Sequence, residues 1–129
     1  MLGKHGKASL GRRPITLLLV GRDLHEAERV RRLLPARVGL SRSPAHARQA
    51  LHGREAPDVV LLEDRAWGAG DEEALDELRE RAAARTLALI LSRRRGERWE
   101  RGEVPVVERP YQMEAIIAAM QLSLLRRKA

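Results

Sequence analysis

Unbroken runs of apolar residues mark the predicted strands of this chain. The run VVLL at 59–62 follows a Pro-Asp pair and ends at two carboxylates, Glu63 and Asp64, with no alternation of polar and apolar positions. Such a run is typical of a strand buried on both faces of a parallel sheet. We therefore predict that the stretch 57–68 contains the central strand, and that functional side chains gather beyond its carboxyl end.

Four more strands are predicted, and stretches of helical periodicity separate them. The strands lie at 15–20, 38–43, 86–91 and 104–107, the last at an edge because Pro105 interrupts it. Helices are predicted to begin at Asp23, at Ser43, at Asp71 and at about Gln112. The pattern is thus one of strands alternating with helices.

The first predicted helix has the clearest signals. Asp23 and Glu26 have the spacing of a capping box, in which each side chain binds the backbone N–H of the other residue. Leu24, Ala27, Val30 and Leu33/Leu34 are expected to form one apolar stripe until Pro35 ends the helix.

This alternation predicts an α/β fold, a doubly wound five-stranded parallel sheet of flavodoxin-like order 2-1-3-4-5. The polar stretch 92–103 contains two glycines, so the fourth of five helical segments is expected to be short. In this order the first and third strands flank the switch point. Gly21, Arg22 and Asp23 are therefore expected to converge with Glu63 and Asp64.

The charge is unevenly distributed. The net charge is +7, and seven basic residues that lie before residue 14 or after residue 125 account for all of it, so 14–125 is neutral. A domain that binds nucleic acid usually carries its basic face on folded structure, so nucleic-acid binding by the body is not expected. We predict a disordered basic lead-in over 1–13 and one domain over 14–127.

Cysteine is absent, so thiolate and disulfide chemistry are excluded, and the four histidines lack a metal-ligand spacing. No apolar run reaches the roughly 20 residues of a membrane span. We expect a cytoplasmic protein that makes no use of a membrane.

From residue 15 to residue 127 the chain resembles the receiver domain of two-component response regulators. PDVVLLE followed by AWG looks like the family's Pro-Asp-x-x-x-x-Asp strand with its Met-Pro-Gly turn. Glu108-Arg109-Pro110 looks like the Lys-Pro turn after the fifth strand. The resemblance implies the CheY-like form of the predicted fold.

The residues that carry receiver chemistry are mostly replaced. In the family, two acids after the first strand bind Mg²⁺, an Asp after the third strand accepts a phosphoryl group, a Thr or Ser follows the fourth strand and a Lys follows the fifth. The corresponding positions here are Gly21 and Arg22, Glu63, Ser92 and Arg109. Only the hydroxyl is kept.

These replacements imply a degenerate pocket, a pseudo-receiver. Mg²⁺ requires oxygen ligands, and the guanidinium of Arg22 would repel it. Without the cation, phosphoryl transfer loses the main stabiliser of its developing charge. We expect no metal, no cofactor and no enzymatic activity. Glu63 is expected to pair with Arg22 or Arg109, and the alternative left open is that it mimics a phosphorylated Asp.

The leading hypothesis is a phosphorylation-independent protein-interaction module of a bacterial signalling or regulatory system. Its candidate partner contacts are the chain's only aromatic residues, Trp67, Trp99 and Tyr111. A homodimer would use the face formed by the fourth helix, the fifth strand and the last helix. Two alternatives are nucleic-acid or anionic-surface binding through the basic ends, and a still phosphorylatable receiver that uses Asp64 after a one-residue register slip.

Overall fold

The computed structural model describes residues 9–10, 13–94 and 104–128, with side chains described for 14–94 and 104–125. In these ranges five parallel strands form one sheet of order β4-β3-β5-β6-β7. Numbered along the chain, this is the predicted order 2-1-3-4-5, which is confirmed. The strands are β3 (Thr16–Val20), β4 (Arg37–Ser41), β5 (Val59–Glu63), β6 (Ala88–Arg94) and β7 (Val106–Arg109).

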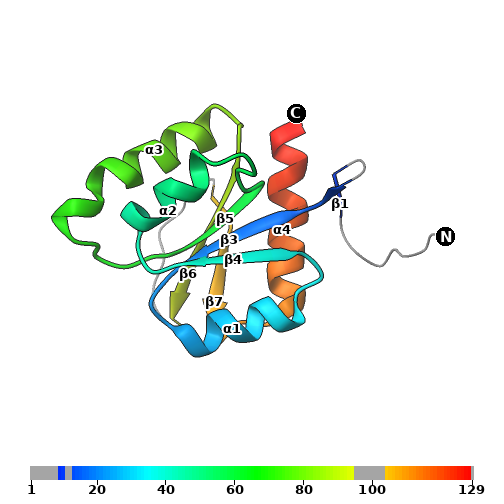
Figure 1. The fold of residues 1–129 in the computed structure, drawn as a ribbon. Coiled ribbons are helices and arrows are strands. Elements are labelled where there is room, and N and C mark those ends of the chain that lie inside the picture. The colour runs from blue at the N-terminus through cyan, green and yellow to red at the C-terminus, as the bar shows by residue number, and fades with distance from the viewer. Residues whose placement is uncertain (1–8, 11–12, 95–103, 129) are drawn as a thin grey trace.

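Helices cover both faces of this sheet (Figure 1). The described ranges contain α1 (Leu24–Leu33), α2 (Pro44–Leu51), α3 (Glu72–Ala83), α4 (Met113–Lys128) and the single 3-10 turn η2 (Ala69–Asp71). One core cluster joins α1 and α4 to one face of the sheet, and the other joins α2 and α3 to the opposite face. The expected short fourth helical segment falls largely on residues 95–103, outside the described ranges.

The central strand is β5, as predicted. All five of its residues are buried, and it lies between β3 and β6. β4 and β7 form the two edges, which agrees with the Pro105 argument. β6 continues to Arg94, beyond the predicted end at Leu91, so two arginines of the polar stretch belong to the strand.

The apolar stripe predicted for α1 is only half correct. Ala27, Val30 and Leu34 are buried, but Leu24 is 59% exposed and Leu33 is 57% exposed. At 3.6 residues per turn, each step of three residues rotates about 60° around the helix, so four such positions cover about half of its circumference. Both ends of the run therefore turn away from the core.

Asp71 was expected to cap α3, and its side chain caps a different helix. It forms no side-chain cap bond in α3, and its Oδ1 accepts a hydrogen bond of 3.0 Å from the backbone N–H of Ala45 in the first turn of α2. Asp71 is buried between the two helices. Its role is to join α2 to α3, which no local pattern could indicate.

The amino-terminal strands β1 (Ser9–Leu10) and β2 (Arg13–Pro14) form a separate antiparallel pair. The hydrophobic pattern contained no signal for it, and the predicted boundary between residues 13 and 14 stays a prediction. Within the described ranges, none of the helices combines the length and the hydropathy that a membrane crossing requires.

Candidate functional site

An open hollow of about 590 Å³ lies at the carboxyl ends of the sheet strands, where the sequence pattern places the functional side chains. Its walls come from the loop after β3 and the first turn of α1, from the ends of β5, β6 and β7, and from the loops after β5 and β7. Charged groups dominate the lining. They are the arginines Arg22, Arg65, Arg94 and Arg109 and the carboxylates Asp23, Glu26 and Glu63, and His25 and Pro110 complete the lining.

Glu63 lies at the centre of this site and is 2% exposed. Side chains alternate along a strand, so Glu63 points to the same face as Leu61, which packs with α1 and α4. Its Oε2 accepts hydrogen bonds from the backbone N–H groups of Arg22, at 2.9 Å, and Asp23, at 3.2 Å. Its Oε1 lies 3.3 Å from Nη1 of Arg109. Both carboxylate oxygens are therefore engaged.

Gly21 makes this position of Glu63 possible. A Cβ atom at residue 21 would lie 2.1 Å from Oε2 of Glu63 and 2.6 Å from its Cδ. Such distances are far inside van der Waals contact, so the carboxylate takes the volume that any other residue at position 21 would fill. Gly21, at the position of the first metal-binding acid, and Glu63, at the acceptor position, are therefore sterically matched, since the carboxylate fits only beside a glycine.

The guanidinium of Arg22 does not pair with Glu63, so the predicted pairing of Glu63 with Arg22 is wrong. The side chain is exposed, and its Cζ lies 5.5 Å from the ring centroid of Trp67, where Arg65 also approaches at 5.3 Å. The Trp67 indole N–H donates to the backbone carbonyl of Glu63 at 3.2 Å. Arg22 is close to Glu63 through its backbone, because the loop after β3 turns its N–H groups toward the carboxylate.

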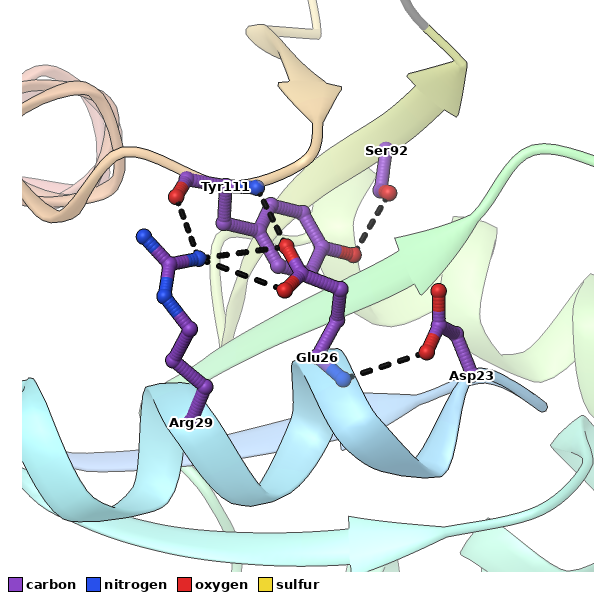
Figure 2. Close-up of polar contacts among 5 residues, drawn as sticks. All are labelled: Asp23, Glu26, Arg29, Ser92 and Tyr111. Atoms are coloured by element: carbon purple, nitrogen blue, oxygen red, sulfur yellow. Dashed lines mark hydrogen bonds and ion pairs between the residues drawn. The ribbon is translucent and has the colours of Figure 1, made fainter.

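Tyr111 is 2% exposed and belongs to the core cluster under α4, so its interpretation as a partner contact is wrong. Its hydroxyl lies 2.6 Å from Oγ of Ser92, the one receiver-type group that the chain keeps (Figure 2). Burial raises the pKa of Tyr111 to about 12, although the bond to Ser92 and the charge of Arg109 act in the opposite direction. Trp99 lies outside the described residues.

The backbone of Tyr111 is held by α1 (Figure 2). Its N–H donates to Oε1 of Glu26 at 2.6 Å, and its carbonyl accepts from Nη1 of Arg29 at 2.6 Å. Asp23 caps α1 by accepting from the N–H of Glu26 at 3.1 Å, but the reciprocal bond of the predicted capping box is replaced, since the Asp23 N–H donates to Glu63. α1 is thus tied to β5 and to the loop before α4.

Asp64, the alternative acceptor, is exposed and follows Glu63 on the strand path, where alternation directs it away from the hollow. Its carboxylate pairs with Arg93, and its backbone N–H donates to the carbonyl of Ser92 at 2.7 Å. The register that a phosphorylatable Asp64 requires is not the one observed, since Glu63 pairs with Ser92.

The resemblance to receiver domains implies Mg²⁺, and the residues present here do not fit it. Gly21 offers no ligand, Arg22 is cationic, and both oxygens of Glu63 are engaged by N–H groups and a guanidinium. Across the described residues, His, Cys, Asp and Glu side chains form no group of three or more that could hold a metal ion.

Two arginines of the site were not singled out from the sequence. Arg94 lies on the same face of β6 as Ser92, which precedes it by two residues. It could have been identified if the predicted strand had been extended by three residues beyond Leu91. Arg65 approaches Oε1 of Glu63 to 3.8 Å from the loop after β5, and no periodic signal indicates a loop residue of this kind.

A scan against protein-family models and a search of curated proteins found no match. The solved structures do contain similar ones. The signal receiver domain of an HD domain-containing protein from Pseudomonas fluorescens is 21% identical with a TM-score of 0.68, over 90% of this chain and 98% of that one. A response regulator receiver domain protein from Clostridium thermocellum is 14% identical with a TM-score of 0.67, over 88% and 97%.

A third similar structure belongs to a longer protein, described as a probable two-component system response regulator/GGDEF domain protein. It is 18% identical with a TM-score of 0.69, over 89% of this chain, and this chain spans 51% of that one. At these identities the likeness shows the fold. The chain therefore has the fold of response regulator receiver domains.

Proposed function

We propose that this receiver-fold domain is a protein-interaction module of bacterial signalling that works without phosphorylation of its own pocket. The observation that carries the proposal is the arrangement of Glu63, whose two carboxylate oxygens are held by two backbone N–H groups and by Arg109. A nucleophile needs an accessible lone pair, and these bonds direct the lone pairs of Glu63 into the protein.

The charge of Glu63 is also compensated without a cation from solution. Phosphoryl transfer depends on positioning and on electrostatic stabilisation of the transferring group, which Mg²⁺ usually supplies. The guanidinium of Arg109 takes the place beside Glu63 where a metal would have to approach. We therefore assign the pocket a structural and recognition role, and no catalytic one.

The kind of partner follows from the surface next to the hollow. Trp67, with Arg22 and Arg65 beside its ring, is of the composition that is enriched in protein interfaces. Leu122 and Leu125 of α4 are 46% and 66% exposed, and they lie on the helix expected to contribute to a homodimer face. A protein partner, a second copy included, fits these surfaces better than a nucleic acid does.

The phosphorylation half of the proposal is tested by intact-mass spectrometry after incubation with Mg²⁺ and a small phosphodonor such as acetyl phosphate. The mass of the wild-type chain is expected to stay unchanged. The control is a variant that restores the receiver residues, Gly21→Asp, Arg22→Asp, Glu63→Asp and Arg109→Lys together, and it is expected to gain a phosphoryl group. A phosphoryl adduct on wild-type Glu63 or Asp64 would contradict the proposal.

The interaction half is tested by light scattering on the purified chain over a range of concentrations, and by capture of partners from the source cell. Leu125→Asp is expected to weaken self-association, whereas Leu33→Asp, at a leucine of α1 that is 57% exposed, serves as the matched control. If neither a dimer nor a captured protein depends on Leu125 or Trp67, the assigned surfaces are wrong.

A further inference from the structure

We propose that the hollow at the carboxyl ends of the strands binds a phosphate group noncovalently and without a metal ion, through Arg22, Arg94 and Arg109. The phosphate is either inorganic phosphate or part of a small phosphorylated metabolite. The inference rests on the proposed function in one respect, since it treats Glu63 as a fixed internal anion and not as a phosphoryl acceptor.

The strand register places two of these arginines side by side. Arg94 and Arg109 are paired positions of β6 and β7, and both line the hollow. Paired residues of neighbouring parallel strands lie on the same face, and the strands are about 4.8 Å apart. Arg109 is already paired with Glu63, whereas no described acid pairs with Arg94 beside it. An anion that binds between the two guanidinium groups supplies a partner for Arg94.

The carboxylates of the hollow are already engaged. Glu63 accepts hydrogen bonds from two backbone N–H groups and forms ion pairs with Arg109 and, at a longer distance, Arg65. Glu26 accepts from Tyr111 and Arg29, which are outside the lining. Asp23 caps α1. These acids therefore leave Arg22 and Arg94 to be neutralised by another group.

Arg109 has N–H donors that its described contact to Glu63 does not use. A guanidinium has five N–H donors, and the described contact of Arg109 to Glu63 uses its Nη1. Nε of Arg109 is buried and has no hydrogen-bond partner among the described residues. Leaving a buried donor without a partner is unfavourable, so an acceptor oxygen within its reach is favoured.

The ligand class follows from charge and shape. Guanidinium groups bind the paired oxygens of phosphate or carboxylate in a bidentate manner, and several arginines around one hollow suit an anion with more than one charge. A volume of about 590 Å³ is in the range of small-molecule sites, so it has room for a phosphate on a small carrier. This combination favours a phosphate over the single charge of an acidic side chain.

Isothermal titration calorimetry on the full chain tests the proposal, in low-salt, phosphate-free buffer from which divalent cations have been removed by a chelating resin. The probes are inorganic phosphate, glucose 6-phosphate and a poly-glutamate peptide. Saturable binding of at least one phosphate is expected, with an affinity that falls as salt is added. Arg94→Gln and Arg22→Gln are each expected to weaken it by roughly tenfold, the usual effect of losing a charged hydrogen bond. Arg79→Gln, an exposed arginine of α3 that pairs with Asp76, is the charge-matched control and is expected to leave the affinity unchanged.

The two phosphate probes separate the two sources, because preference for glucose 6-phosphate indicates a metabolite and equal affinity indicates the bare anion. Absence of saturable phosphate binding overturns the inference, as does an equal loss in Arg79→Gln, a requirement for Mg²⁺, or binding of the peptide alone. Intact mass is measured on the same samples. A covalent adduct would contradict the proposed function, whereas an unchanged mass without binding would contradict only this inference.

Discussion

Gly21 and Glu63 fit together as backbone and side chain: a methyl group on residue 21 would lie 2.1 Å from the Oε2 atom of Glu63. The two residues are far apart in the sequence, yet they adjoin because β3 and β5 are neighbours in the sheet. At the receiver positions to which these residues correspond, a metal-binding acid stands opposite a shorter Asp. Here Glu63, the longer acid, occupies the space that a side chain at residue 21 would fill.

We predict that Gly21→Ala destabilises the domain by roughly 1 to 3 kcal/mol, since the added methyl must displace a buried carboxylate. Glu63→Ala removes the atoms with which the methyl would clash. In the Glu63→Ala background, Gly21→Ala should therefore cost much less. The double-mutant cycle is measured by urea denaturation, and additive effects would show that the two residues are not in contact.

Glu63→Gln is predicted to lower the free energy of unfolding by roughly 2 to 4 kcal/mol, because it leaves the charge of Arg109 buried without its partner. The matched variant is Asp64→Asn, the next residue, whose exposed pair with Arg93 is worth less than about 1 kcal/mol. Thermal and chemical denaturation of both variants measure the difference. Equal effects would mean that the burial of Glu63 does not determine its contribution.

The pKa of Tyr111 gives a pH prediction. Burial raises this pKa from 10.0 to about 12, so the folded state holds its phenolic proton more tightly than the unfolded state does. The corresponding stability is present below pH 10 and is lost as the pH rises toward 12, by an amount of about 2 kcal/mol. Tyr111 is the only tyrosine of the chain, so its ultraviolet absorbance titration reports this group alone.

Tyr111→Phe is the control for this titration. It removes the ionising group and leaves Oγ of Ser92 without its 2.6 Å partner, at a cost of roughly 1 to 2 kcal/mol at neutral pH. The difference in stability between wild type and variant should shrink above pH 10. A tyrosine that titrates at its ordinary value would show that the ring is not buried in solution.

Asp71→Ala is predicted to destabilise the domain by roughly 1 to 2 kcal/mol, through the first turn of α2 and not through its own helix. The reason is that its carboxylate binds the N–H of Ala45. Hydrogen exchange at the start of α2 should accelerate in this variant. Asp76→Ala, on the exposed side of α3, should leave that exchange unchanged.

The sequence alone was sufficient for the five strands of the parallel sheet, their order and most helix starts. Continuous apolar runs identified β3 and β5, and the capping residues Asp23 and Ser43 stand where the structure has them. The strands and the helix starts depend on interactions within a few residues along the chain, such as side-chain periodicity and the bond from a cap to the third residue of its helix. The strand order followed from the alternation of strands with helices. Local patterns record such interactions directly.

Tertiary structure decided which partner each polar group of the site has. Glu63 binds backbone N–H groups some 40 residues earlier, and its conformation depends on the space that Gly21 leaves. Arg22 was expected to pair with Glu63, and the structure places its guanidinium beside Trp67. The partner of each of these groups depends on the free volume and the hydrogen-bond donors that neighbouring strands supply at the site. A pattern along the chain does not contain the distances between strands.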